Sequence, residues 1–108
     1  MNSDKAFIKE SMSVNKPISG AILPEFKTEM AKVLAFGASK YGRDNWAKCN
    51  KDQLHLYWDA LYRHIEAFQA GEDTDLETGL SHLSHAACNL MFLQHLTNKY
   101  KGLNDEHK

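Results

Sequence analysis

The chain has 108 residues, of which 43% are apolar and 25% charged, with a net charge of −1. This length favours one domain with a single modest core, and the composition is typical of a globular protein. With a near-neutral charge, the sequence shows no electrostatic sign of binding to long nucleic acids or anionic membranes, and it contains no run of about 18 apolar residues that could cross a bilayer. The two cysteines, Cys49 and Cys88, lack the spacing of a zinc or redox motif, so we expect a reduced, cytoplasmic protein.

The first part of the chain is predicted to be an arm followed by a helix. Residues 1–23 are polar and contain turn-forming pairs, with room for a short helix at 4–11. Pro24 suits a first helical turn, and apolar residues recur at helical spacing over 24–40. Residues 40–46 break this periodicity and predict a polar, aromatic loop.

Two further helices are predicted in the second part. Apolar spacing predicts a helix over 51–70, which Gly71 ends. The last helix is predicted from residue 76 or 80 to residue 100, and it is apolar on most sides. Residues 102–108 are expected to form a disordered tail. The chain is therefore predicted to be an all-α bundle of three main helices spanning 24–101, which a homodimer or homotetramer would complete.

Side chains that bind metals gather around the connection between the last two helices. In an antiparallel pair, a histidine near the end of one helix and two near the start of the next lie at similar heights. Four carboxylates within six residues repel one another unless a cation or protons intervene. The cluster predicts a metal site at one end of a helical hairpin, and its members are His64, Glu66, Glu72, Asp73, Asp75, Glu77, His82 and His85.

Structural interpretations of the same residues stay open. The histidines could be core side chains that bond to loop carboxylates. Thr74 and Glu77 have the spacing of a capping box, and Asp75 is a competent N-cap, so these residues could start the last helix. Capping alone does not require Glu72 and Asp73 as well. Asp73 is expected to be solvated, and Glu66, two residues from His64 and so on another side of the helix, is expected to be structural.

The loop after the first helix carries side chains suited to a nucleotide. Lysine and arginine can hold phosphates, aromatic rings can stack on a base, and asparagine can read a base edge. Gly37 suggests close approach by a ligand or another backbone. A surface loop anchored by its tryptophan is the alternative. The candidate substrate-binding residues are Lys40, Tyr41, Arg43, Asn45 and Trp46, to which Asn89 on the last helix is added, and Arg63 is a further phosphate clamp.

Together these blocks resemble the phage dATP/dGTP diphosphohydrolase family, which is related to the MazG-like all-α nucleoside triphosphate pyrophosphohydrolases. The resemblance covers roughly residues 16–97 and is carried by F-G-A-S-K-Y-G-R-D-N-W, A-L-Y-R-H and G-E-D-T-D-L-E-T-G-L-S-H-L-S-H-A-A-C-N-L-M-F-L. It implies an all-helical oligomer, a divalent metal (usually Mg or Mn), and cleavage of nucleoside triphosphates, purine deoxynucleotides above all, to the monophosphate and pyrophosphate. The positions that match are Gly37, Lys40, Tyr41, Gly42, Asn45, Trp46, Arg63, His64, Gly71, Glu72, Asp75, Glu77, Gly79, His82, His85 and Asn89.

These matches imply roles for individual residues, in a protein expected in the cytoplasm, or in the host cytoplasm if a phage encodes it. The metal ligands are expected to be Glu72, Asp75, His82 and His85, and the catalytic residues Glu77 as the base, His64 and Arg63. The wider MazG-like group holds its metals with an E-E-x-x-E helix and an E-x-x-D helix. In this chain His82 and His85 replace acids, and Asn89 stands near the position where the last aspartate is expected. Imidazole suits Mn, Fe, Co or Zn better than Mg. Two alternatives stay open: a phosphohydrolase acting on nucleoside mono- or diphosphates, and a non-catalytic protein that binds or scavenges nucleotides.

Overall fold

The computed structural model describes residues 16–106, and the side chains of residues 16–102. Within this range the protein is all-α, as predicted, and an isolated bridge between Thr74 and Ser81 is the only β-type pairing. The short helix expected at 4–11 lies outside the described residues. The elements are the 3₁₀ turns η2 (Ser19–Ala21), η3 (Asn45–Lys48) and η4 (Lys51–Gln53) and the helices α2 (Pro24–Tyr41), α3 (His55–Gln69) and α4 (His82–Glu106).

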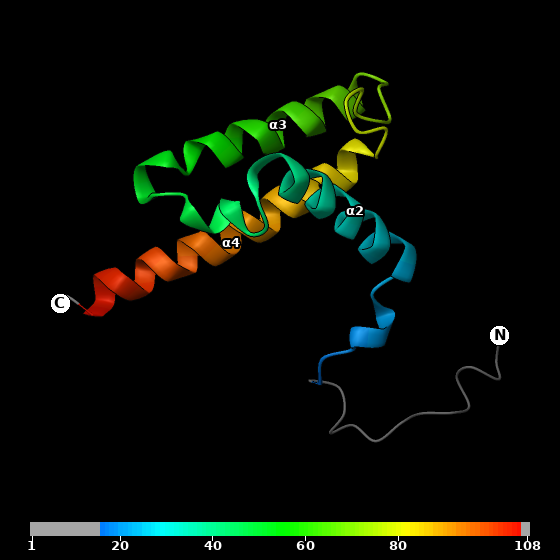
Figure 1. Ribbon diagram of the computed structural model, residues 1–108. Coiled ribbons are helices and arrows are strands. Elements are labelled where there is room, and N and C mark those ends of the chain that lie inside the picture. Colours follow the sequence, from blue (N-terminus) through cyan, green and yellow to red (C-terminus); the bar gives the residue numbers. More distant parts are fainter. Residues whose placement is uncertain (1–15, 107–108) are drawn as a thin grey trace, which may run out of the picture.

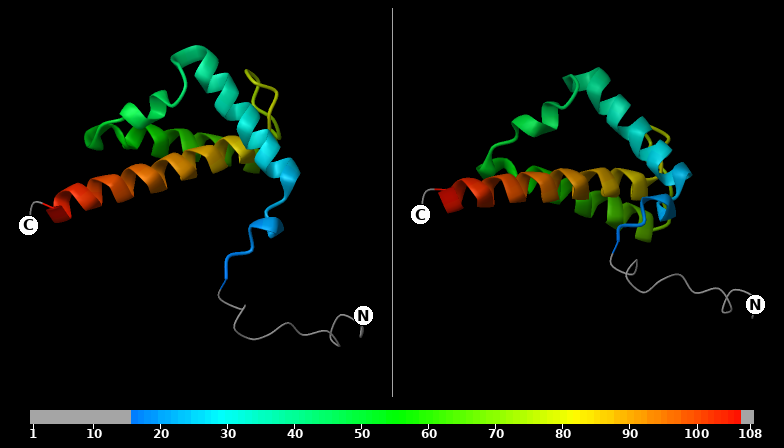
Figure 2. Two further views of the ribbon diagram at one scale, coloured as in Figure 1. Left: turned by 60° about the horizontal axis from the view of Figure 1, so that its bottom comes forward. Right: turned by 90° about the horizontal axis from the view of Figure 1, so that it is seen from below.

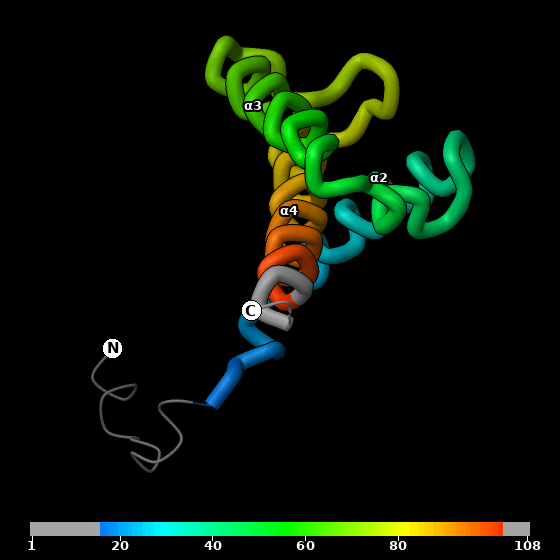
Figure 3. Tube along the Cα trace, turned by 90° about the vertical axis from the view of Figure 1, so that its left-hand side faces the viewer, coloured from blue at the N-terminus to red at the C-terminus, as the bar shows by residue number. Residues whose placement is uncertain are grey.

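Helices α3 and α4 run antiparallel along one another, and α2 packs across the first half of α4 (Figure 1). The segment with η3 and η4 leads from the far end of α2 back to α3, so that α2, this segment and α4 outline a triangle (Figure 2). In a view along α4, α2 and α3 lie on different sides of it, and the loop that joins α3 to α4 arches away beside α3 (Figure 3). Among the described residues, no helix combines the length and the apolar character that a membrane span needs.

The core is small and lies between α3 and α4. Leu61 of α3 packs with Ala86 and Leu93 of α4, and Leu96 and Cys88 are fully buried on the same helix. Partly buried side chains from α3 extend this cluster, which is the reason that the two helices stay in contact along their length. Burial of these side chains drives the hairpin to form.

Helix α2 has no buried residue, so its attachment to the core differs from that of α3. Glu29 of α2 accepts hydrogen bonds from the backbone N–H of Ser81 at 2.9 Å and from the hydroxyl of Ser84 at 2.8 Å. These bonds lower the pKa of Glu29, the Ser84 bond contributing most. A carboxylate from another helix thus helps to cap the start of α4.

The end of α3 follows the prediction in detail. Gly71 has a φ of 101°, its N–H bonds to Phe68 O at 3.0 Å, and the N–H of Glu72 bonds to Ala67 O at 3.0 Å. These two bonds form a Schellman motif, in which a glycine supplies the left-handed residue after the helix.

The predicted bounds of the last helix are wrong at both ends. The helix begins at His82, where the Ser81 hydroxyl accepts the N–H of Leu83 at 3.1 Å, so neither Asp75 nor a Thr74–Glu77 capping box starts it. The helix continues through residues 102–106, which the sequence analysis assigned to a disordered tail. Gly102 does not stop it because one glycine costs only about 1 kcal/mol and no proline follows. The division into an arm and a domain stays a prediction.

Leu96 tests the assigned core. We expect Leu96→Ala to lower the free energy of unfolding by about 2–5 kcal/mol, because the side chain is 0% exposed and its truncation leaves a cavity. Leu76→Ala is the control: this side chain is 91% exposed, and its loss should change stability by less than about 0.5 kcal/mol. Urea denaturation followed by circular dichroism measures both, and equal effects would contradict the assignment.

Candidate functional site

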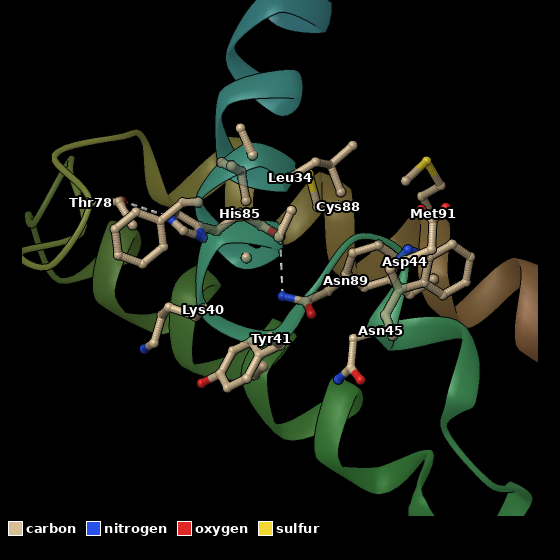
Figure 4. Close-up of a pocket in the computed structure, with 18 of the residues that line it drawn as sticks. Leu34, Lys40, Tyr41, Asp44, Asn45, Thr78, His85, Cys88, Asn89 and Met91 are labelled. Carbon is tan, nitrogen blue, oxygen red and sulfur yellow. Dashed lines mark hydrogen bonds between the residues drawn. The ribbon is translucent and has the colours of Figure 1, made fainter.

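A cavity of about 700 Å³ lies between α2, the η3 segment, the loop after α3, and α4. Its lining includes most of the site residues expected from the sequence, drawn from segments far apart along the chain. Figure 4 shows Thr78 and His85 on one side, Asp44, Asn45 and Met91 on the other, and Asn89 between them. The expected residues that line the cavity are Lys40, Tyr41, Arg43, Asn45, Trp46, His64, Asp75, Glu77, His85 and Asn89.

Three imidazoles from the two antiparallel helices meet beside this cavity, where His64 and His85 line it and His82 lies behind them, outside its lining. His64 of α3 and His82 of α4 place their Nδ1 atoms 2.8 Å apart. The ring of His64 also stacks on that of His85, with centroids 4.5 Å apart and an angle of 10° between the planes. The similar heights expected for these histidines are therefore observed.

Asp75 organises the loop that faces the histidines. Its Oδ1 accepts hydrogen bonds from the backbone N–H groups of Glu77 and Thr78, both at 2.9 Å, and from the Thr78 hydroxyl at 3.3 Å. The Thr78 hydroxyl also lies 2.7 Å from Nε2 of His85. The aspartate thus closes a tight turn, and the turn holds His85 by a side chain that the sequence analysis did not single out.

His82 has a buried nitrogen without a hydrogen-bond partner among the described residues. The side chain is 5% exposed. Its Nε2 lies 3.2 Å from Oε2 of Glu72, but the two groups are not aligned for a hydrogen bond. Leaving a buried polar atom unpaired costs about 1–3 kcal/mol, so such an atom needs an explanation.

The site favours neutral imidazoles beside an ionised carboxylate. Burial, followed by the charges of His85 and His82, lowers the pKa of His64 to about 4. Burial also lowers the pKa of His85. For Asp75, burial raises the pKa, but the hydrogen bonds from Thr78 and Glu77 and the charge of His85 together lower it. Neutral imidazole and carboxylate are the protonation states in which these groups bind metals.

The donor set fits a divalent transition metal. One donor atom each from His64, Asp75 and His82 lies within 4.8 Å of the others. Two imidazoles and a carboxylate, with an unpaired buried nitrogen, suit Mn, Fe, Co or Zn better than Mg. Compared with the expected ligands, His64 joins the group, whereas His85 bonds to Thr78 and Glu72 lies beside His82.

Glu77 and Lys40 form an ion pair across the edge of the cavity. Lys40 Nζ lies 3.1 Å from Glu77 Oε2, although the two residues are 37 positions apart. This bond raises the pKa of Lys40. Both side chains are largely exposed, so the pair adds little to stability and can open when a ligand competes for either group.

Other candidates do not face the cavity as expected. Arg63 is exposed and does not line the cavity, because neighbouring residues on a helix point about 100° apart, and His64 takes the inward position. Arg43 borders the cavity, yet its side chain is 91% exposed and its nearest charged partner is Asp44, 3.7 Å away. Trp46 stacks on Phe92 with centroids 4.6 Å apart, as the alternative of an anchoring tryptophan predicts.

Comparison with known proteins identifies the family. Residues 8–106 match the family described as "dATP/dGTP diphosphohydrolase, N-terminal". The chain belongs to this family. A dATP/dGTP diphosphohydrolase of Salmonella phage PMBT28 is 45% identical over 75 residues, which are 69% of this chain and 25% of the relative. The chain thus spans a quarter of the length of that relative, and no solved structure matches it.

The lowered pKa of His64 makes stability depend on pH. Between about pH 6.5 and about 4, the unfolded chain binds a proton at His64 that the folded chain does not, so the free energy of unfolding falls as the pH falls. His85 acts in the same direction, and so do the lowered pKa values of Glu29 and Asp75, but these carboxylates act only near the lower end of this window and below it. Urea denaturation of the protein in EDTA at several pH values measures the slope.

The matched variants are His64→Gln and His55→Gln, since both lie on α3 and His55 is exposed. The first should flatten the slope and the second should not. A wild-type slope that persists in His64→Gln would contradict the burial assigned to this imidazole.

Proposed function

We propose that this chain hydrolyses nucleoside triphosphates, preferentially purine deoxynucleotides, to the monophosphate and pyrophosphate with a divalent metal. The observation that carries the proposal is the group of His64, Asp75 and His82, of which His64 and Asp75 line a cavity of about 700 Å³. Cavities of about 300–1,000 Å³ are typical of sites for small molecules. The description of the family and the name of the phage relative support this substrate class.

His64, Asp75 and His82 would hold the metal, with Glu72 beside the unpaired nitrogen of His82. A bound divalent ion neutralises phosphate oxygens and lowers the pKa of an attacking water. The neutral state of His64 and the ionised state of Asp75 prepare these ligands without a further proton loss at neutral pH. The ligand types favour Mn, Fe, Co or Zn, although Mg stays a candidate.

Lys40 and Glu77 would act on the phosphates together. A triphosphate that binds Lys40 competes with Glu77 for the ammonium group, because both are anions. The released carboxylate can then accept a proton from water near the metal group, since Glu77 lines the same cavity as Asp75. In the absence of substrate, the Glu77 carboxylate is thus paired with Lys40, and it becomes free to act as the general base only when a triphosphate binds Lys40.

The nucleobase would lie in another part of the cavity, near Tyr41, Asn45 and Trp46, which line it. Tyr41 is 64% exposed and available to cover a ring, whereas one face of Trp46 is occupied by Phe92. We assign Tyr41 as the main stacking partner. Trp46 shapes the wall behind the base.

A non-catalytic nucleotide-binding role is the second candidate. It is favoured by the exposed position of Arg63 and by the ion pair that occupies Glu77, since both reduce the charge available to stabilise a transition state. The reaction product separates the remaining possibilities, because a phosphohydrolase acting on mono- or diphosphates would release orthophosphate.

The activity test uses the purified chain with Mn²⁺ or Co²⁺ and each of the four deoxynucleoside triphosphates. We expect pyrophosphate release, highest with the purines and abolished by EDTA. Asp75→Asn and His82→Ala should each lower kcat/KM by more than about 100-fold, since loss of even an outer partner of a metal ligand costs about 10- to 100-fold. The control His55→Ala, at an exposed position of α3, should retain activity.

A direct reading of the metal accompanies this test. The absorption spectrum of bound Co²⁺ reports ligand number and type, and its visible bands should disappear in His82→Ala but persist in His55→Ala. Full activity in a His82→Ala, Glu72→Ala double variant would rule this site out. Nucleotide-induced melting shifts without turnover would favour the binding protein.

We also propose that the chain assembles into a homodimer or homotetramer. Large apolar side chains stay exposed on α3 and α4, and patches of this kind usually mark interfaces. Trp58 and Tyr62 stack on one another on the outside of α3, 6.1 Å apart, and Leu83 and Leu90 lie seven residues apart on one side of α4. The burial of such side chains by a second copy would stabilise a chain with so small a core.

Light scattering measures the assembly directly. It is carried out at about micromolar concentration, because affinities typical of specific interfaces keep the copies together at that concentration. We expect a mass at least twice that of the chain. Leu90→Glu should lower it, because a carboxylate cannot be buried unpaired in an interface. A monomeric mass for the wild-type chain would contradict the proposal.

A further inference from the structure

We propose that Asn89 selects the base of the substrate by accepting a hydrogen bond from an exocyclic amino group of the purine. This inference rests on the proposed function and names the residue that would set its base preference. It follows from the burial of Asn89, from the single orientation that its amide can take, and from its place in the cavity.

Asn89 is a buried amide that lines the cavity. The side chain is 8% exposed and projects from α4 one turn after His85. A buried amide offers two donors and an acceptor, and each atom left without a partner costs free energy. The groups that Asn89 does and does not bond therefore indicate what it can bind.

The helix itself decides which way the amide points. Asn89 Nδ2 donates to the backbone carbonyl of His85 at 3.1 Å. If the amide were turned over, its oxygen would face that carbonyl oxygen, and two acceptors repel. The NH₂ group is thus fixed towards α4, and Oδ1 points away from it. Figure 4 draws this bond and shows the Asn89 oxygen on the opposite side, towards Asn45 and Tyr41.

The oxygen of Asn89 is open to a ligand. Among the described residues, the Asn89 side chain makes only the bond to His85, and its oxygen is not among the sealed, unpaired atoms. A fixed acceptor without a protein donor, at the wall of a cavity, is a group that discriminates between ligands by their donors. It binds an N–H or O–H group and repels a carbonyl oxygen.

The position of Asn89 matches the nucleoside part of a bound nucleotide. His85 and Thr78 lie on one side of it and Asn45 on the other (Figure 4). With the triphosphate at the metal group, the chain of atoms from phosphate to base passes Asn89. The donors within a purine nucleotide are the 6-amino group of adenine, the N1–H and 2-amino group of guanine, and the sugar hydroxyl. We assign the contact to the base, because Asn45 and Tyr41, which are suited to a base, face the same oxygen.

The test compares nucleotides that differ by one donor. The pairs are dATP with the deoxynucleoside triphosphate of unsubstituted purine, which lacks the 6-amino group, and dGTP with dITP, which lacks the 2-amino group. In the wild-type chain kcat/KM should fall about tenfold or more when the donor that Asn89 reads is removed. In Asn89→Leu, which removes the acceptor but fills the space, the ratio within that pair should approach one.

The control is Asn98→Leu, because Asn98 is an exposed asparagine on the same helix and does not line the cavity. It should keep the wild-type ratio. An Asn89→Leu variant that loses activity equally on both members of each pair would show a structural role only and would overturn the proposal. If Asn89 instead contacts the sugar, kcat/KM of the wild-type chain would be lower with dideoxy-ATP than with dATP, and Asn89→Leu would show no such difference. This result would also overturn the proposal.

If the chain does not hydrolyse the nucleotides, a binding measurement replaces the kinetic one. The same ratios are measured as dissociation constants of the corresponding α,β-methylene analogues in the presence of Co²⁺. A preserved donor preference without pyrophosphate release would refute the proposed catalysis while supporting the role of Asn89. Turnover without any donor preference would do the reverse.

Discussion

The antiparallel contact between α3 and α4 is the constraint on which the rest of the structure depends. Leu61, Ala86 and Leu93 hold the two helices together along one face. The same contact brings His64 and His82 within 2.8 Å of each other, although 18 residues separate them in the chain. A small core thus positions polar groups whose burial costs free energy, among them the Nε2 atom of His82, which has no hydrogen-bond partner in the part of the chain that the structure describes. A ligand that binds these groups would explain why the hairpin tolerates this loss of stability.

The opposite wall of the cavity is held in a different way. Helix α2 has no buried residue, and its ties to α4 include the bonds from Glu29 to Ser81 and Ser84. A further contact between this wall and the site, the ion pair of Lys40 and Glu77, is also polar. The cavity is therefore formed by a helical hairpin with a buried apolar core and by a helix whose apolar side chains are only partly buried, and which polar contacts also tie to α4.

Helical periodicity in the sequence predicts features formed by neighbouring residues, but it does not predict contacts between segments far apart in the chain. It predicts the three helices, the glycine that ends α3, and the equal heights of the histidines, because all of these follow from 3.6 residues per turn. It cannot predict that Glu29 reaches a serine 52 positions away. It misplaces the start of α4, because Asp75 has the chemistry of an N-cap but caps a tight loop instead. The prediction that Arg63 binds phosphate is not supported for a geometric reason. Its neighbour His64 points towards the cavity, and adjacent residues on a helix point in different directions, so Arg63 points outward.

The distribution of charge around the cavity explains why a cation is central to the proposed reaction. Within the described residues, Arg63 points away from the cavity, Arg43 is almost fully exposed, and Lys40 is already paired with a carboxylate. The imidazole of His64 is neutral near pH 7, whereas Asp75 is charged. The side chains alone thus offer a triphosphate little positive potential, and the carboxylates repel it. A divalent ion held by the histidines and Asp75 would reverse the sign of the field at that end. Binding of substrate and activation of water would then depend on the same ion, and base selection at Asn89 would act on a nucleotide already oriented by its phosphates.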